Sequence, residues 1–222
     1  MLTISRPVLA RILPFALYML FLAMEQGMRA GAVAAFDLRW LYPVKVAVVA
    51  FALWHFRAEY RELLDRPARL PLAVSLLVGV LVFVLWINLD HGWLNLGGAA
   101  GYDPRTPDGG LDWPLVAFRL AGAALVVPPM EELFWRSFLM RWVERQDFLS
   151  VPAAEVGIRA ILISSLLFGV EHSLWFAGIL AGLAYAGLYR YYGNLWLAVA
   201  AHACTNLILG LWVLQTGNWR FW

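Results

Sequence analysis

The segment from Val127 to Arg136 carries two adjacent carboxylates and an arginine in a stretch otherwise apolar enough to cross a bilayer. Ionised side chains in hydrocarbon cost at least about 2.5–3.5 kcal/mol each, so those found there usually have a function. Glu132 and Arg136 are four residues apart on one helical face, so they can form an ion pair. Glu131 lies about 100° further round the helix and has no partner in its own segment. Glu131 is therefore a candidate general base.

Two later apolar segments carry further polar groups. His172 lies near the end of one segment, and His202 and Asn206 share a helical face inside another. Glu131, His172 and His202 each fall within about two turns of the middle of their segments, so they can meet at a similar depth. His172 fits this placement least well, because it is close to its helix end.

Each group also has a plainer interpretation. A single histidine in a span is more often hydrogen-bonded packing than a catalyst, and an intramembrane Glu–Arg pair can be purely structural. An asparagine in a span often only bonds a neighbouring helix. Three such groups on three segments, with few other ionisable residues nearby, are harder to explain by packing alone. We therefore expect one shared site.

The chemistry that this set supports is the attack of water on a carbonyl. A carboxylate in an apolar pocket can accept a proton from water near neutral pH. One histidine can hold the same water, while the second histidine and the Asn206 amide donate to the developing oxyanion. Alternatively, Glu131, His172 and His202 could ligate zinc, which activates its bound water. The residue pattern leaves both mechanisms open.

Other intramembrane hydrolases are disfavoured by missing motifs. The chain has no His-Glu-x-x-His, no Gly-x-Ser-Gly and no Gly-x-Gly-Asp. Cys204 lies two residues from His202, so on a helix its thiol points away from the imidazole and cannot easily form a catalytic pair. We expect Cys204 to pack as a small residue.

The composition places these residues in a membrane. Hydrophobic residues make up 62% of the 222 residues and charged residues 14%, against about 45–50% and about 25% in soluble domains. The formal net charge of +2 gives no reason to expect nucleic acid as a partner, and a single cysteine allows no intramolecular disulfide. The sequence therefore predicts an integral membrane protein.

We predict an all-α fold, a polytopic transmembrane helical bundle of about seven spans that forms one integral membrane domain over residues 1–222. The predicted spans cover residues 7–26, 41–57, 70–90, 114–142, 157–173, 175–192 and 194–214. Most are near the roughly 20 residues that a bilayer requires, although the second and fifth are short. Pro128 and Pro129 should kink the fourth span or split it in two.

The connections carry the remaining polar sequence. With seven spans, ten arginines would lie on the side of the N-terminus and six basic residues on the other, which favours a cytoplasmic N-terminus. The charged segment 57–66 indicates a solvated helix end. Residues 91–113 are rich in glycine, proline and aspartate, which is typical of a solvated connection; a lid that gates the substrate is the alternative.

Polar residues of three apolar segments resemble, in order, the three motifs of the CPBP family, which comprises CAAX prenyl endopeptidases and bacteriocin-processing or self-immunity proteins. The matching motifs are Glu131-Glu132-x-x-x-Arg136, Phe168-x-x-x-His172 and His202-x-x-x-Asn206. The resemblance covers about residues 115–215 and implies an intramembrane endopeptidase. It implies that Glu131 is the base, that Glu132 and Arg136 support it, and that His172 holds the water. The third motif would form the oxyanion side. The family is often labelled metalloprotease, but the resemblance also permits a metal-free water activated by glutamate, which we favour.

Three further stretches resemble a bacterial branch called CAAX prenyl protease-related protein, which is associated with exosortase and PEP-CTERM protein-sorting systems. They are Trp40–Lys45, Phe134–Trp142 and Phe168–Trp175. This resemblance implies a bacterial inner-membrane protein with sorting components as candidate partners. Bacteria generally lack prenylated CAAX proteins, so the family name does not define the substrate.

We therefore predict an intramembrane endopeptidase that cleaves a membrane-associated protein or peptide. One alternative is a non-catalytic immunity or scaffold protein of a sorting system. Another is a proton-coupled transporter that uses Glu131 and the two histidines as a relay. Five polar positions in the family's order favour the enzyme, whereas proton uptake into liposomes would favour the transporter.

Overall fold

The computed structural model describes residues 5–31, 37–97 and 101–222, and this part of the chain is all-α. Its helices are α1 (Arg6–Ala30), α2 (Leu41–His55), α3 (Arg69–Asn88), α4 (Trp113–Ala121), α5 (Val127–Glu132), α6 (Met140–Glu144), α7 (Ile158–Val170), α8 (Trp175–Tyr192) and α9 (Leu195–Thr216). Helices α4, α5 and α6 form one rod, because the π-helical segments Gly122–Val126 and Leu133–Leu139 join them.

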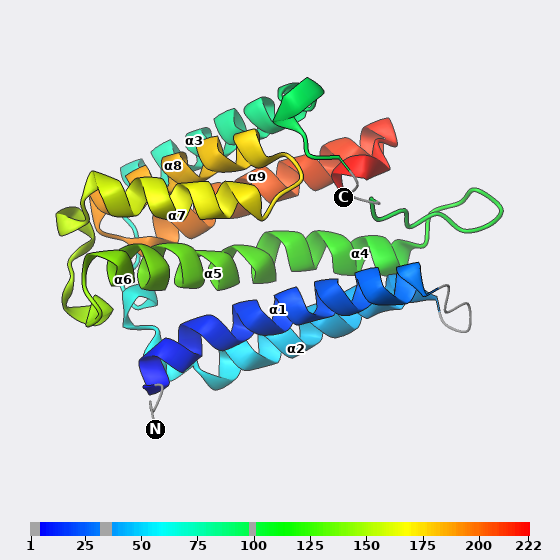
Figure 1. The fold of residues 1–222 in the computed structure, drawn as a ribbon. Helices are drawn as coiled ribbons and strands as arrows, with labels where there is room; N and C mark the ends of the chain where they lie inside the picture. Colours follow the sequence, from blue (N-terminus) through cyan, green and yellow to red (C-terminus); the bar gives the residue numbers. More distant parts are fainter. Residues whose placement is uncertain (1–4, 32–36, 98–100) are drawn as a thin grey trace.

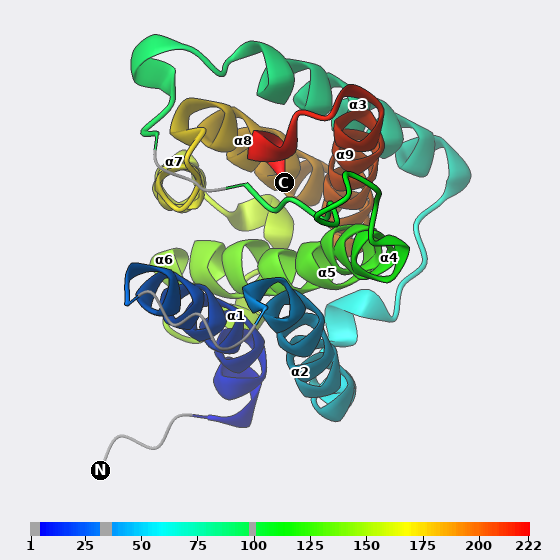
Figure 2. The ribbon, with the colours of Figure 1, turned by 90° about the vertical axis from the view of Figure 1, so that its right-hand side faces the viewer.

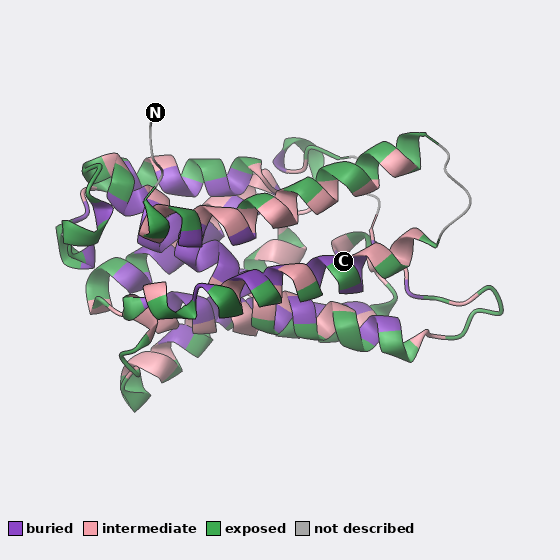
Figure 3. Cartoon of the chain, turned by 90° about the horizontal axis from the view of Figure 1, so that it is seen from below, coloured by how far each residue is buried: buried purple, intermediate pink, exposed green. Residues whose placement is uncertain are grey.

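The rod α4–α6 runs through the middle of the bundle (Figure 1). Helices α1 and α2 lie along one side of it, and α3, α7, α8 and α9 lie along the other (Figure 2). Buried residues gather inside the bundle (Figure 3). The outer faces are apolar and exposed, for example Leu20 and Met24 of α1 and Leu77 and Leu81 of α3. Such exposed apolar faces fit contact with lipid.

Among the described residues, four helices are long and apolar enough to cross a membrane: α1, α3, the rod Trp113–Glu144 and α9. They indicate a multi-pass membrane protein. All seven predicted segments are helical, but seven spans are not confirmed. Helix α7 has 13 residues and α2 has 15, so they rise about 20 and 22 Å, less than the roughly 30 Å of a hydrocarbon core.

The prolines do not split the rod in two, which is one of the two outcomes that the sequence predicts, but the helix is irregular just before them. The amide of Val127 donates to the carbonyl of Gly122, five residues back, so the turn before the prolines is widened. Pro128 and Pro129 then occupy the first turn of α5, where a missing amide costs little. The widened turn explains how two consecutive prolines are accommodated in mid-span.

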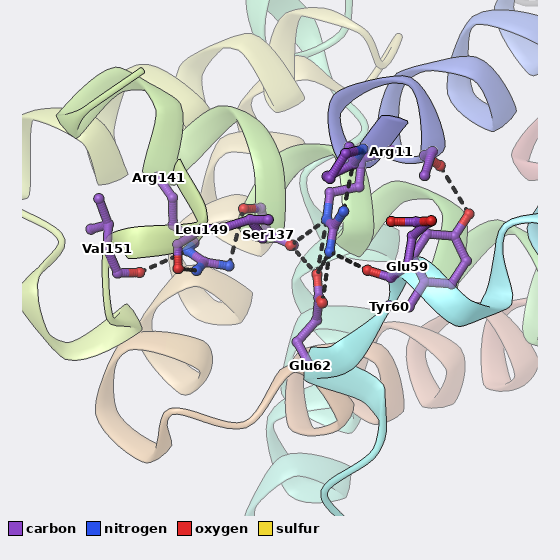
Figure 4. Close-up of polar contacts among 10 residues, drawn as sticks. Arg11, Glu59, Tyr60, Glu62, Ser137, Arg141, Leu149 and Val151 are labelled. Carbon is purple, nitrogen blue, oxygen red and sulfur yellow. Dashed lines mark hydrogen bonds and ion pairs between the residues drawn. The ribbon is translucent and has the colours of Figure 1, made fainter. Parts of the chain in front are cut away.

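Arg11 is buried rather than flanking a span in solvent. Its side chain is 1% exposed and donates to the Glu62 carboxylate at 2.7 Å, to the Ser137 hydroxyl at 3.0 Å, and to the carbonyls of Pro7 and Glu59 at 2.9 Å (Figure 4). The charged segment after α2 is therefore not simply a solvated helix end, because it supplies Glu62 to this cluster. Each guanidinium nitrogen of Arg11 has at least one acceptor, which indicates a structural role.

Glycines bring α7 and α8 into close contact. A Cβ atom built on Gly182 would lie 2.9 Å from the Cα of Ser165, and one on Gly169 would lie 2.6 Å from the carbonyl oxygen of Trp175. Small residues at a helix crossing let two backbones approach in this way. The contact positions the C-terminal end of α7, from which His172 follows.

We expect Gly182→Ala to lower the midpoint of thermal unfolding in detergent, because overpacking of a tight contact costs about 1–3 kcal/mol. Gly187→Ala is the matched control in the same helix, since a Cβ at Gly187 would meet nothing within 4 Å. The control should be neutral or slightly stabilising, because alanine favours a helix over glycine. Equal midpoints for the two variants would contradict the tight α7–α8 contact.

Candidate functional site

A cavity of about 210 Å³ lies between the rod and α7, α8 and α9. Its lining includes five of the residues singled out in the sequence: Glu131, Phe168, His172, His202 and Asn206. They come from three helical segments that are far apart in the sequence, and α8 adds Ala181 and Tyr185. Glu132 and Arg136 do not line the cavity but are buried beside it, each with 0% of its surface exposed.

Glu131 is the carboxylate that faces the cavity. It is 4% exposed, and its Oε2 is buried with no hydrogen-bond partner in the described part of the chain. Buried polar groups are almost always paired in folded proteins, because an unpaired one loses its hydration without compensation. Among the described residues, Oε2 of Glu132 and of Glu171 also lack a hydrogen-bond partner, but of these three carboxylates Glu131 is the one that lines this cavity.

Glu132, the adjacent carboxylate, has two charged or polar partners, although among the described residues only its Oε1 is hydrogen-bonded. His202 Nδ1 donates to its Oε1 at 2.9 Å, and its Oε2 lies 3.2 Å from Nε of Arg136. The ion pair expected from the spacing of Glu132 and Arg136 is thus present, and an imidazole has joined it. Of the two adjacent carboxylates, Glu132 is thus held by Arg136 and His202, whereas Oε2 of Glu131 has no partner among the described residues.

The Arg136 guanidinium lies between aromatic rings. Its Cζ is 4.4 Å from the centre of the Phe168 ring and 5.5 Å from that of Tyr185. Its Nη2 donates to the carbonyl of Gly182 at 3.2 Å. Aromatic faces attract a cation, most strongly where water is excluded. Phe168 and Tyr185 therefore stabilise the buried guanidinium cation of Arg136 beside Glu132.

Both histidines have Nδ1 fixed by an acceptor. The imidazole of His172 donates from Nδ1 to the Phe168 carbonyl at 2.7 Å, just as that of His202 does to Glu132. When neutral, each ring then carries a lone pair on Nε2. The His202 ring also stacks on Tyr185 at 5.1 Å, and the His172 ring meets the edge of Trp86 at 5.3 Å. These contacts hold both rings in place.

Asn206 is positioned by the irregular turn in the rod. Its Nδ2 donates to the carbonyl of Ala123 at 2.9 Å. That carbonyl has no helical donor, because the amide of Val127 is bonded to Gly122 and the next position, Pro128, has no N–H. The prolines therefore create an acceptor that anchors Asn206, whose second N–H has no acceptor among the described residues.

Comparison with known proteins singles out the same part of the chain. Residues 113–208 match the family described as type II CAAX prenyl endopeptidase Rce1-like. The matching part, hereafter the Rce1-like region, runs from the start of α4 into α9 and contains all seven residues predicted for the site. It spans less than half of the chain, and α1, α2 and α3 lie outside it. No curated protein and no solved structure matches the chain.

The Rce1-like region also contains site residues that the sequence analysis missed. The Tyr185 hydroxyl donates to Thr205 Oγ1 at 2.8 Å, and Thr205 donates to the Gly79 carbonyl of α3 at 2.9 Å. These bonds fix the ring on which His202 stacks. Helix α8 contains three further tyrosines, so its sequence does not single out Tyr185 for this role. Trp86, which lies outside the Rce1-like region, gives no signal in its sequence context.

A second cavity of about 490 Å³ adjoins the first and shares Trp86, Arg119, His172, Phe221 and Trp222 with it. It also contains Glu171, which the sequence analysis did not single out. The short segment that follows α7 thus places His172 in both cavities and Glu171 in the second cavity only.

The geometry does not fit the zinc alternative. Within residues 5–31, 37–97 and 101–222, no three His, Cys, Asp or Glu side chains form a group that could hold a metal ion. The proposed ligands Glu131, His172 and His202 line one cavity without forming such a group. We therefore derive no step through a metal.

Proposed function

We propose that the protein is an intramembrane endopeptidase that hydrolyses a peptide bond of a membrane-associated protein or peptide by glutamate-activated water. The observation that carries the proposal is the buried, unpartnered Glu131 carboxylate, which faces a cavity shared with His172, His202 and Asn206. The family match of residues 113–208 supports the same reaction class.

The reaction begins with water in the cavity, whose 210 Å³ exceeds the roughly 30 Å³ that one water occupies in the liquid. Glu131 takes one proton as the water oxygen attacks the carbonyl carbon, and Nε2 of His172 accepts a hydrogen bond from the other. The tetrahedral intermediate then collapses as Glu131 passes its proton to the leaving amine nitrogen. No covalent enzyme intermediate is required.

The oxyanion forms on the opposite side of the reacting carbon. The free N–H of Asn206 can donate to it, and so can Nε2 of His202 when that ring is protonated. Glu132 holds Nδ1 of His202 at 2.9 Å and so provides the negative charge that offsets a cationic ring. This divides the work between two neighbouring carboxylates: Glu131 moves the proton, and Glu132 positions the imidazole.

We also propose that the protein lies in a bacterial inner membrane with its N-terminus in the cytoplasm. Its proposed partners are components of an exosortase or PEP-CTERM sorting system. These proposals come from the sequence patterns. The sorting association depends on the stretches Trp40–Lys45, Phe134–Trp142 and Phe168–Trp175.

The function can be tested by comparing the membrane proteomes of cells that express the wild type, Glu131→Gln or Glu155→Gln. Glu155 is an exposed carboxylate in a short turn and serves as the control. We expect an uncleaved precursor to accumulate only with Glu131→Gln, at equal amounts of each variant. If no precursor accumulates, the protein is not an endopeptidase in these cells. Proton uptake in liposomes that is lost with Glu131→Gln would then identify the transporter.

A further inference from the structure

A third cavity, of about 500 Å³, lies beside the candidate site between α1, α2 and α4. These helices are neighbours at one end of the bundle (Figure 2). The third cavity shares Tyr18, Tyr42, Arg119 and Trp222 with the cavity that contains Glu131. The two spaces are therefore adjacent, with Arg119 at their boundary.

The third cavity has an excess of positive charge. Its charged lining residues are Glu25, Arg29, Lys45 and Arg119. Glu25 and Arg29 satisfy each other, because their side chains are joined at 2.8 Å. Lys45 and Arg119 remain, and within the described part of the chain neither forms an ion pair with a carboxylate.

Both remaining cations are held by aromatic rings alone. Lys45 is 2% exposed, and its Nζ is 4.4 Å from the centre of the Tyr18 ring and 5.0 Å from that of Tyr42. The Arg119 Cζ is 4.5 Å from the Tyr42 ring, and its Nε is buried without an acceptor among the described residues. Ring faces replace only part of the lost hydration of a cation. Lys45, which is buried, and Arg119, which is half-buried with a buried Nε, face one cavity whose described lining gives them no anion.

We propose that this cavity is an anion-binding subsite that holds a carboxylate of the substrate peptide, either its free chain end or an Asp or Glu side chain. The inference rests on the proposed function and adds a feature of the substrate. It also gives a role to Tyr42 and Lys45, which belong to the stretch Trp40–Lys45 outside the Rce1-like region.

The position of Arg119 favours a peptide over a lipid phosphate. Arg119 and Glu131 are twelve residues apart on one rod, which corresponds to about 18 Å of helix rise. An extended peptide of about five or six residues covers that distance. A carboxylate at the subsite and a peptide bond beside Glu131 can therefore belong to one chain that passes through the two adjoining cavities.

Binding can be tested without cleavage in the full-length Glu131→Gln protein, placed in nanodiscs of uncharged phosphatidylcholine. The probes are a capped apolar octapeptide with a free C-terminal carboxylate, its C-terminal amide, and the amide with one Asp near its C-terminus. We expect each acidic peptide to bind about tenfold more tightly than the neutral amide, as charge-assisted hydrogen bonds confer. Equal affinities, or no binding of any peptide, would overturn the subsite.

Substitutions of Lys45 and Arg119 test whether the third cavity causes the preference for acidic peptides. Adding Lys45→Gln or Arg119→Gln should reduce the preference to less than about threefold, as expected when one of two charged partners is lost. Arg61→Gln removes a positive charge from an exposed position elsewhere and should keep it. Unfolding midpoints check that each variant is folded, and Arg119→Lys, which keeps the charge, should restore part of the preference. Retention of the full preference in both glutamine variants would overturn the assignment.

A separate measurement tests whether the third cavity binds a lipid phosphate instead of a peptide carboxylate. If phosphatidylglycerol in the nanodiscs raises the unfolding midpoint only when Lys45 and Arg119 are present, while acidic and neutral peptides bind equally, the ligand is a lipid phosphate and the peptide assignment fails. This measurement needs no turnover. A preference for acidic peptides without any precursor in the proteome experiment would leave the subsite standing and refute the endopeptidase.

Discussion

Replacing Glu131 by glutamine should lower the rate of peptide-bond cleavage by about 10²–10⁴-fold, the contribution typical of a positioned general base. Glutamine has almost the same shape but cannot take a proton from water. The measurement is the cleavage rate of the accumulated precursor by purified protein. Glu155→Gln, which changes an exposed carboxylate in the same way, should cleave at the wild-type rate. Wild-type cleavage by Glu131→Gln would refute the assignment of the base.

Removing the Glu131 charge should raise the stability of the folded protein, although it lowers the rate of cleavage. The Glu131 carboxylate is 4% exposed and lacks a partner for Oε2, so its burial is unfavourable. We expect Glu131→Met, of similar volume, to raise the midpoint of thermal unfolding by about 2–4 °C for each kcal/mol of relief. An inactive protein with raised stability is the result expected of a catalytic group. A fall in the midpoint would instead indicate a structural carboxylate.

The sequence predicts where helices form better than how far they reach. Apolar runs place all seven helical segments within a few residues, because burial of apolar side chains decides where a helix forms. Helix length in the folded chain depends on capping and packing, and α2 and α7 end at 15 and 13 residues. Local rules also fail where distant groups intervene. The sequence around Arg11 gives no sign of its partners, because Glu62 and Ser137 supply acceptors from other parts of the chain.

In the candidate site too, the sequence predicts contacts between residues of one helix but not contacts between residues of different helices. Helical spacing predicts the Glu132–Arg136 pair, and the structure contains it. Spacing cannot predict that His202, 70 residues away, bonds to Glu132 rather than facing only the cavity. Nor can it predict the partner of Asn206, because the free carbonyl of Ala123 arises from a widened turn before two prolines. These contacts depend on how the helices cross.

The second large effect should follow loss of the Arg136 charge. Arg136 and Glu132 are both 0% exposed, and Nε of Arg136 lies 3.2 Å from Oε2 of Glu132. Arg136→Met leaves a buried carboxylate with one imidazole as its remaining partner, and breaking a buried pair in this way typically costs about 3–5 kcal/mol. We expect the midpoint of thermal unfolding in detergent to fall by roughly 10 °C or more. Arg57→Met, which removes an exposed arginine, is the control.

A second substitution separates the pair from the packing around it. If the uncompensated charge causes the loss, Glu132→Gln added to Arg136→Met should recover a large part of the midpoint, since replacing both partners of a buried pair is often close to neutral. Cleavage should stay low in the double variant, because glutamine provides no negative charge to offset a protonated His202. No recovery in the double variant would show that Arg136 stabilises the bundle mainly through Phe168, Tyr185 and the Gly182 carbonyl. Full recovery of both stability and cleavage would show that the ion pair has no role in the reaction.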